Sequence, residues 1–141
     1  MGFSIDRIDH VVLNCKDVEA TVAWYKRVLG MESEVFGEYR HTALKFGRQK
    51  FNVRATGTAD WWSVTNDAPG ALDLCFITQQ PPDQVLAHLK ACDVTVLRGP
   101  SRQIGALGPM TSVYFHDPDG NLVEVASYGA ESGVPEPVGR P

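Results

Sequence analysis

The chain has 141 residues, of which 43% are hydrophobic and 21% charged, and its formal net charge at pH 7 is −4. This length and composition suit one small globular domain with its own core. The negative charge argues against a nucleic-acid or anionic-membrane partner, because such partners require clustered Lys and Arg. No apolar run reaches the roughly 18 residues of a membrane helix, and the N-terminus does not have the pattern of a signal peptide.

Three cysteines, Cys15, Cys75 and Cys92, lie far apart in the sequence. They form neither a CxxC motif nor a recognisable disulfide framework. Reduced thiols packed as small apolar side chains are therefore expected, which is typical of a cytoplasmic protein.

The first half of the chain begins with a predicted buried strand at residues 8–14, which are mainly apolar and β-branched. A helix follows, because Asp17 is a suitable N-cap, apolar residues recur at helical spacing, and Gly30 suits a left-handed position after the helix. Three further strand-like stretches, separated by glycines, are predicted near residues 31–37, 41–47 and 49–55.

A polar segment at residues 56–70, which contains Trp61 and Trp62, is predicted to be a loop. The pattern then starts again with an apolar strand at 71–78 and a helix opened by Pro81-Pro82-Asp83. Strands are predicted near residues 94–98, 110–116 and 121–127, the last two joined by a turn at Asp117-Pro118-Asp119-Gly120-Asn121.

Each half therefore reads strand, helix and three strands, which is an internal repeat of two βαβββ modules in an α+β fold. We assign residues 1–128 to one domain. It comprises module 1 at about 5–56, a linker loop at 57–70 and module 2 at about 71–128. Residues 129–141 form a Gly/Pro-rich tail without a periodic pattern.

Three sequence stretches resemble the vicinal oxygen chelate superfamily, which includes glyoxalase I, extradiol dioxygenases and bleomycin-binding proteins. They are IDHVVL at 8–13, YKRVLGM at 25–31 and VYFHDPDGNLVE at 113–124. The resemblance covers about residues 5–128. It implies that the two modules form an open, eight-stranded, U-shaped sheet around a cavity for metal and substrate. It also implies a homodimer, and exposed strand edges favour such pairing.

By position, the resemblance implies that His10, Asp73 and Glu124 are metal ligands. Arg54 occupies a fourth ligand position, but a guanidinium has no lone pair to offer a metal. The apolar neighbours of Asp73 predict a buried carboxylate, which needs either a metal or Arg54 as its partner. Asp9, beside His10, is expected on the opposite face of the strand and so outside the site.

One imidazole and two carboxylates form a hard, oxygen-rich ligand set. Such a set favours Fe(II) or Mn(II) over Mg(II), Ni(II) and Zn(II) as the divalent cofactor. Three protein ligands would leave open positions where a small-molecule substrate with two adjacent oxygens can chelate.

Further site residues follow partly from the resemblance. Ser112 and Tyr114 occupy positions that point into the cavity in related transferases, so we predict that both bind substrate and that Tyr114 is catalytic. Arg54 is predicted to be catalytic and substrate-binding through its charge. Trp61 and Trp62 are predicted to contact a planar aromatic substrate as a lid, although a hydrophobic plug over the sheet is an equally good interpretation.

The function predicted from these residues is that of a metal-dependent enzyme. Dioxygenase-type oxidation of an aromatic or quinone-like substrate with adjacent oxygens is favoured over glyoxalase-like lyase or isomerase chemistry. The alternative is a metal-free, bleomycin-resistance-like protein that binds a drug or metabolite, in which Arg54 pairs with Asp73 or Glu124.

Overall fold

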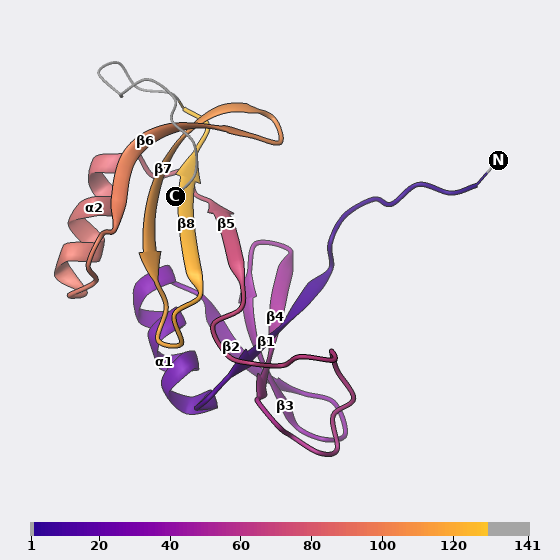
Figure 1. Cartoon of the computed structure of the whole chain (residues 1–141). Coiled ribbons are helices and arrows are strands. Elements are labelled where there is room, and N and C mark those ends of the chain that lie inside the picture. Colours follow the sequence, from indigo (N-terminus) through magenta and orange to yellow (C-terminus); the bar gives the residue numbers. More distant parts are fainter. Residues whose placement is uncertain (1, 130–141) are drawn as a thin grey trace. The chain divides into compact units, whose positions relative to one another are not determined.

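The computed structural model describes residues 2–129, so residues 130–141, most of the predicted tail, lie outside the described residues. The chain divides into two compact units with the boundary between Pro69 and Gly70. Each unit contains one four-stranded sheet and one helix (Figure 1). The predicted α+β fold with two βαβββ modules is therefore confirmed. The joining of both sheets into a single U stays a prediction.

The first unit has a sheet in the order β1-β4-β3-β2, in which β1 and β4 are parallel and the other neighbours antiparallel. Parallel strands need a crossover, and α1 supplies it. The elements of this unit are β1 (His10–Cys15), α1 (Val18–Leu29), β2 (Glu32–Phe36), β3 (His41–Phe46) and β4 (Gln49–Ala55).

Helix α1 has both predicted caps. The Asp17 carboxylate accepts a hydrogen bond from the backbone N–H of Ala20 at 3.0 Å, and Gly30 adopts the left-handed conformation with φ of 65°. These contacts satisfy backbone groups that the helix itself leaves unpaired at its ends. Tyr25 and Val28 are buried, and the ring of Tyr25 meets that of Phe51 edge to face at 5.6 Å.

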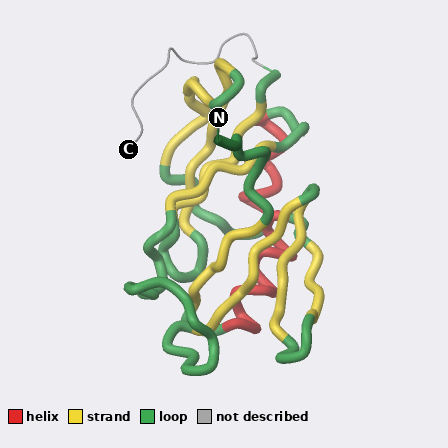
Figure 2. Tube along the Cα trace, turned by 90° about the vertical axis from the view of Figure 1, so that its right-hand side faces the viewer, coloured by secondary structure: helices red, strands yellow, loops and turns green. Residues whose placement is uncertain are grey.

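The two faces of the first sheet differ. Side chains that point toward α1 form the core, with Leu13, Leu44 and Phe51 fully buried. Burying each such side chain contributes about 1.5–3 kcal/mol. Alternation along each strand places the next residues on the opposite face, which we call the open face. Figure 2 shows the helices against one side of the strands within each unit.

The second unit repeats this plan, with the sheet order β5-β8-β7-β6 and a parallel β5–β8 pair. Its core contains Leu89 from the helix together with Val113, Phe115 and Val123 from the strands. The elements are β5 (Asp73–Ile77), α2 (Pro82–Ala91), β6 (Arg98–Gly105), β7 (Gly108–His116) and β8 (Leu122–Ser127).

Strand β6 lies further along the chain than the sequence predicted. The expected strand near 94–98 is replaced by Arg98–Gly105, half of whose residues have polar side chains. Ser101 and Gln103 are buried on one face of β6, and the Gln103 amide donates a hydrogen bond to the Ser101 hydroxyl at 3.2 Å. A strand whose buried face is polar shows no apolar alternation, so the pattern missed it.

Strand β5 is also less buried than predicted. It is an edge strand, and Asp73, Cys75 and Ile77 are exposed. The expectation of a buried Asp73 carboxylate is therefore wrong. The apolar composition of this strand suggested burial on both faces, but only Leu74 and Phe76 point toward the core side.

The turn between β7 and β8 is confirmed and is built on buried polar side chains. The Asp117 carboxylate accepts hydrogen bonds from the backbone N–H groups of Asp119 and Asn121, each at 2.9 Å, and from the Asn121 side-chain amide at 2.7 Å. The Asn121 side chain in turn accepts from the backbone N–H of Leu72 at 2.9 Å. The turn therefore fixes the segment that leads directly into Asp73.

Close packing at the same turn explains Gly70. Its φ is +85°, and a Cβ there would lie 2.3 Å from the carbonyl oxygen of Asp119. Only glycine fits this position without moving the turn.

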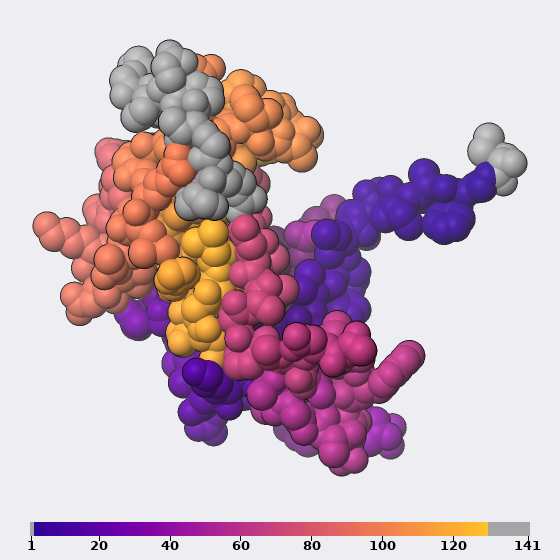
Figure 3. Space-filling view, in the orientation of Figure 1, coloured from indigo at the N-terminus to yellow at the C-terminus, as the bar shows by residue number. Residues whose placement is uncertain are grey.

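In the part of the chain that the structure describes, neither helix is long and apolar enough to cross a membrane. The segment before β1 carries the exposed side chains of Phe3, Ile5 and Ile8. Figure 3 shows this segment, in indigo, as an extended arm.

Candidate functional site

The predicted metal ligands lie at matching places in the two units. His10 is the first residue of β1 in the first unit, and Asp73 is the first residue of β5 in the second. Glu124 lies on β8, next to β5. Within neither unit do the described residues gather three His, Cys, Asp or Glu side chains into a metal-binding group. His10 belongs to the first unit, and Asp73 and Glu124 belong to the second.

His10 has a carboxylate partner that the sequence argument had excluded. Its Nδ1 lies 2.9 Å from Asp9 Oδ2. Asp9 precedes the first residue of the strand, so the alternation that was expected to turn it away does not apply. The hydrogen bond with His10 lowers the pKa of Asp9. In the neutral tautomer whose Nδ1–H is donated to this carboxylate, Nε2 has the free lone pair, which is the arrangement commonly found for metal-binding histidines.

Glu124 carries a buried carboxyl group in the second unit, with 1% of its surface exposed. The hydroxyl of Ser112 donates a hydrogen bond to Glu124 Oε2 at 2.6 Å. Tyr114 is the register partner of Glu124 on β7 and is fully buried. The structure thus brings together three predicted site residues, Ser112, Tyr114 and Glu124, on one face of the second sheet.

The strand registers reveal a residue that the sequence argument missed. His10 and Asp73 open equivalent strands. His10 pairs with Lys50 on β4, and Asp73 pairs with Leu122 on β8. Asn52 and Glu124 each lie two residues beyond these partners, so they occupy equivalent positions. Asn52 is 9% exposed, and its Oδ1 has no hydrogen-bond partner among the described residues. Arg54 lies two residues further along β4. The internal repeat, aligned by strand pairing rather than by motif, would have identified Asn52.

Arg54 binds residues of its own unit. Its guanidinium donates to Asp67 Oδ2 at 2.6 Å, Asn14 Oδ1 at 2.8 Å, and the carbonyl oxygens of Thr58 at 3.0 Å and Trp61 at 3.3 Å. The side chain is 7% exposed. These four hydrogen bonds use four of its five N–H donors. Arg54 is therefore a positioning residue that fixes the loop after β4 against the sheet.

The ion-pair partner of Arg54 is Asp67, whereas the metal-free interpretation of the sequence had paired Arg54 with Asp73 or Glu124. The hydrogen bond from Arg54, followed by one from the backbone N–H of Gly57, lowers the pKa of Asp67. The Thr56 hydroxyl also donates to the Asp67 carbonyl oxygen. Both ends of the loop are tied together through this one residue.

The two predicted lid tryptophans behave differently. Trp61 stacks on His41 with ring centroids 3.9 Å apart and an interplanar angle of 11°, and Tyr39 stacks on His41 at 6.1 Å and 25°. Trp62 is 97% exposed. Trp61 is thus an ordered part of the first unit, whereas the side chain of Trp62 is open to solvent.

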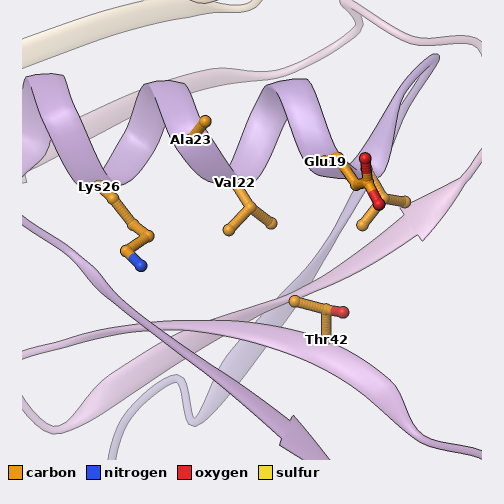
Figure 4. Close-up of a pocket in the computed structure, with 6 residues that line it drawn as sticks. Glu19, Val22, Ala23, Lys26 and Thr42 are labelled. Carbon is orange, nitrogen blue, oxygen red and sulfur yellow. The ribbon is translucent and has the colours of Figure 1, made fainter.

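A pocket between α1 and β3 lies on the helix side of the first sheet (Figure 4). Val22 and Thr42 line it, and Glu19 and Lys26 lie near its two ends. It is therefore separate from the open face that carries His10, and it brings no predicted site residue.

The chain matches a known protein family along most of its length. A family model described as Glyoxalase/Bleomycin resistance protein/Dioxygenase superfamily matches residues 7–125. Virulence protein STM3117 of Salmonella typhimurium is 39% identical over 124 residues, which cover 88% of this chain and 85% of that protein. Glyoxalase domain-containing protein RDO1 of Mycosarcoma maydis is 38% identical over 125 residues, which cover 89% of this chain and 70% of that one.

Among solved structures, the integron cassette protein VCH_CASS1 from the mobile metagenome of V. cholerae has a TM-score of 0.88 and 40% sequence identity. The match covers 92% of this chain and 100% of that chain. With a family model over most of its length and relatives of this similarity, the chain belongs to the glyoxalase/bleomycin resistance protein/dioxygenase superfamily.

Proposed function

We propose that the protein is a metal-dependent enzyme whose ligands are His10, Asp73 and Glu124. The observation that carries this proposal is the buried Glu124 carboxylate, oriented by the Ser112 hydroxyl. The Ser112 hydroxyl donates to one carboxylate oxygen and so fixes the orientation of the group. Carboxylate oxygens are hard donors of the kind that divalent Fe(II) and Mn(II) accept.

The donor set fits such a cation. His10 presents Nε2 because Asp9 holds Nδ1, and the two carboxylates supply hard oxygen ligands, which favours Fe(II) or Mn(II). When bound, a metal of this kind acts as a Lewis acid toward a substrate with two adjacent oxygens.

The remaining residues bind and orient the substrate. Tyr114, beside Glu124, is the proposed catalytic residue, and its hydroxyl can hold or move a proton at a substrate oxygen. Arg54 acts indirectly, since its charge is engaged with Asp67 and its hydrogen bond holds Trp61. The ordered stack of Trp61 and His41 favours an aromatic or quinone-like substrate. Dioxygenase-type oxidation is therefore proposed ahead of lyase or isomerase chemistry.

A metal-free protein that binds a drug or metabolite is the second candidate. The same aromatic stack favours it, because Arg54 holds the stack in place without help from any metal ligand. Metal uptake separates the two candidates.

Mn(II) titrated into chelator-treated protein and followed by electron paramagnetic resonance tests the metal site. We expect one Mn(II) per chain, and we expect His10→Ala and Glu124→Gln each to weaken its binding by about a hundredfold or more, because each removes a ligand. Glu32→Gln, an exposed glutamate on β2, is the matched control and should bind as the wild type does.

Asp9→Asn extends the same titration. An amide is a poorer acceptor for the Nδ1 proton, so Mn(II) binding should weaken by about tenfold while remaining measurable. Unchanged Mn(II) binding in both His10→Ala and Glu124→Gln would contradict the proposed ligand set.

We also propose that the protein is a homodimer. Strands β1 and β5 are edge strands of their sheets, and exposed edges favour pairing with another chain. Sedimentation velocity at micromolar concentration should show a species of twice the chain mass. A monomer at that concentration would show the proposal to be wrong.

A further inference from the structure

The open face of the first sheet carries a connected group of aromatic rings. Tyr39, His41 and Trp61 form a stack, and Phe36 meets His41 edge to face at 5.9 Å and 75°. Trp61 and His41 are half-buried and Tyr39 is exposed, so part of the aromatic surface of the stack is accessible to solvent. Exposed aromatic groups of this size are uncommon in soluble proteins and often mark binding sites.

Two polar side chains, those of Lys50 and Asn52, lie on the same face of the sheet. The Lys50 ammonium lies 3.7 Å from the centroid of the Phe36 ring. Asn52 follows Lys50 by two residues on β4, and its buried Oδ1 has no hydrogen-bond partner among residues 2–129. A buried acceptor without a partner is unfavourable, so a ligand that donates a hydrogen bond there is bound more tightly.

A small side chain lies beside this acceptor. Ala43 is the register partner of Asn52 on β3, two residues after His41 of the stack. His10 is the register partner of Lys50 on β1, so the proposed metal ligand lies next to the same group. The acceptor, the cation and the rings therefore surround one small region of the first sheet.

The ring surface is also held in place before any ligand binds. Arg54 donates to the carbonyl oxygen of Trp61, and Asp67 anchors the other end of the loop. A preformed site loses less conformational entropy on binding than a mobile one.

We propose that Trp61, His41, Phe36, Lys50 and Asn52 form an aromatic subsite. It takes a planar aromatic ring that bears a hydrogen-bond donor for Asn52 and a negative charge for Lys50. The ring packs against the stack, as aromatic pairs do at offset or edge-to-face geometry. The inference rests on the proposed function only in identifying this ring as part of the substrate. Binding itself needs no metal and is measured without it.

Isothermal titration calorimetry of chelator-treated protein with 6-hydroxy-2-naphthoate tests the subsite. This probe has a planar ring, a hydroxyl donor and a carboxylate at its far end. We expect saturable binding, weakened about tenfold for 6-methoxy-2-naphthoate, which lacks the donor, and abolished for 4-hydroxycyclohexanecarboxylate, which lacks the ring.

Two variants address the residues separately. Trp61→Ala should weaken binding of both naphthoates by about tenfold, whereas Asn52→Leu should weaken only that of the hydroxyl compound. Val64→Ala, an exposed apolar residue of the same loop, is the matched control and should bind normally. Equal binding of the hydroxyl and methoxy compounds to the wild type and to Trp61→Ala would overturn the inference, as would failure of the wild type to bind either.

The outcome is independent of that of the metal titration. Mn(II) uptake without naphthoate binding would overturn the aromatic subsite alone. Naphthoate binding without Mn(II) uptake would support the subsite and contradict the metal-dependent enzyme, leaving the metal-free binding protein.

Discussion

Arg54→Met should lower the free energy of unfolding by about 3 kcal/mol while leaving metal uptake unchanged. Methionine keeps much of the buried stem but removes four hydrogen bonds and the charge that faces Asp67. The carbonyl oxygens of Thr58 and Trp61 lose their donor, so the loop after β4 should loosen. Chemical denaturation measures the change, and Arg48→Met, an exposed arginine in the β3–β4 turn, is the control.

The pH dependence of this difference tests the ion pair directly. Arg54 lowers the pKa of Asp67 in the folded protein, so the stabilisation is present above the unfolded value of about 3.9 and is lost as the pH falls through the lower folded value. The gap in melting temperature between wild type and Arg54→Met should therefore be wide at neutral pH and narrow below about pH 4.

The same variant bears on function. Should Arg54→Met release bound metal as well as loosen the loop, the assignment of Arg54 to the loop alone would be wrong. Should the gap in melting temperature stay constant down to pH 2, Asp67 would not be the partner that matters. With metal retained, any loss of turnover is assigned to a displaced Trp61.

Asn121→Ala should be comparably destabilising, by about 3 kcal/mol. Asn121 is buried, and its side chain joins the β7–β8 turn to the backbone of Leu72 while donating to Asp117. Alanine leaves the Leu72 N–H and one Asp117 oxygen without these partners, at about 1–3 kcal/mol for each buried group. Denaturant unfolding gives the magnitude, and hydrogen exchange of the Leu72 amide should become much faster than in the wild type.

Asn66→Ala is the control for this experiment. Asn66 is exposed and its side chain accepts one hydrogen bond from the backbone N–H of Ala68, so the loss should be about 0.5 kcal/mol or less. Equal losses in both variants would show that the turn network has no special role in placing the start of β5.

Much of the fold was predictable from local chemistry. Asp17 and Gly30 marked the ends of α1, and residues 117–121 marked the β7–β8 turn, because caps and turns depend on a few neighbouring residues. Strand β6 was misplaced because its buried side chains, Ser101 and Gln103, are polar. Edge position, which leaves Asp73 exposed, depends on strand order and so is not visible in the composition of the strand itself.

The candidate site was predictable only in part for a similar reason. Ser112, Tyr114 and Glu124 do lie together. Ser112 and Tyr114 are two residues apart on β7 and so share one face, and Glu124 is the register partner of Tyr114 on β8. The partner of Arg54 depends on the path of the loop that carries Asp67, and sequence spacing does not give that path. The stack of Trp61 on His41 likewise joins a loop to a strand twenty residues away. Identifying Asn52 as a site residue required the register of β4 against β1, which the sequence does not give.

The proposed binding of a divalent metal by His10, Asp73 and Glu124 is tested most directly by elemental analysis. The wild-type protein is purified without chelator, alongside Glu124→Gln prepared in the same way. We expect close to one iron or manganese per wild-type chain and a large loss in Glu124→Gln with the fold retained. Metal-free wild-type protein that also fails to take up Fe(II) or Mn(II) would contradict it.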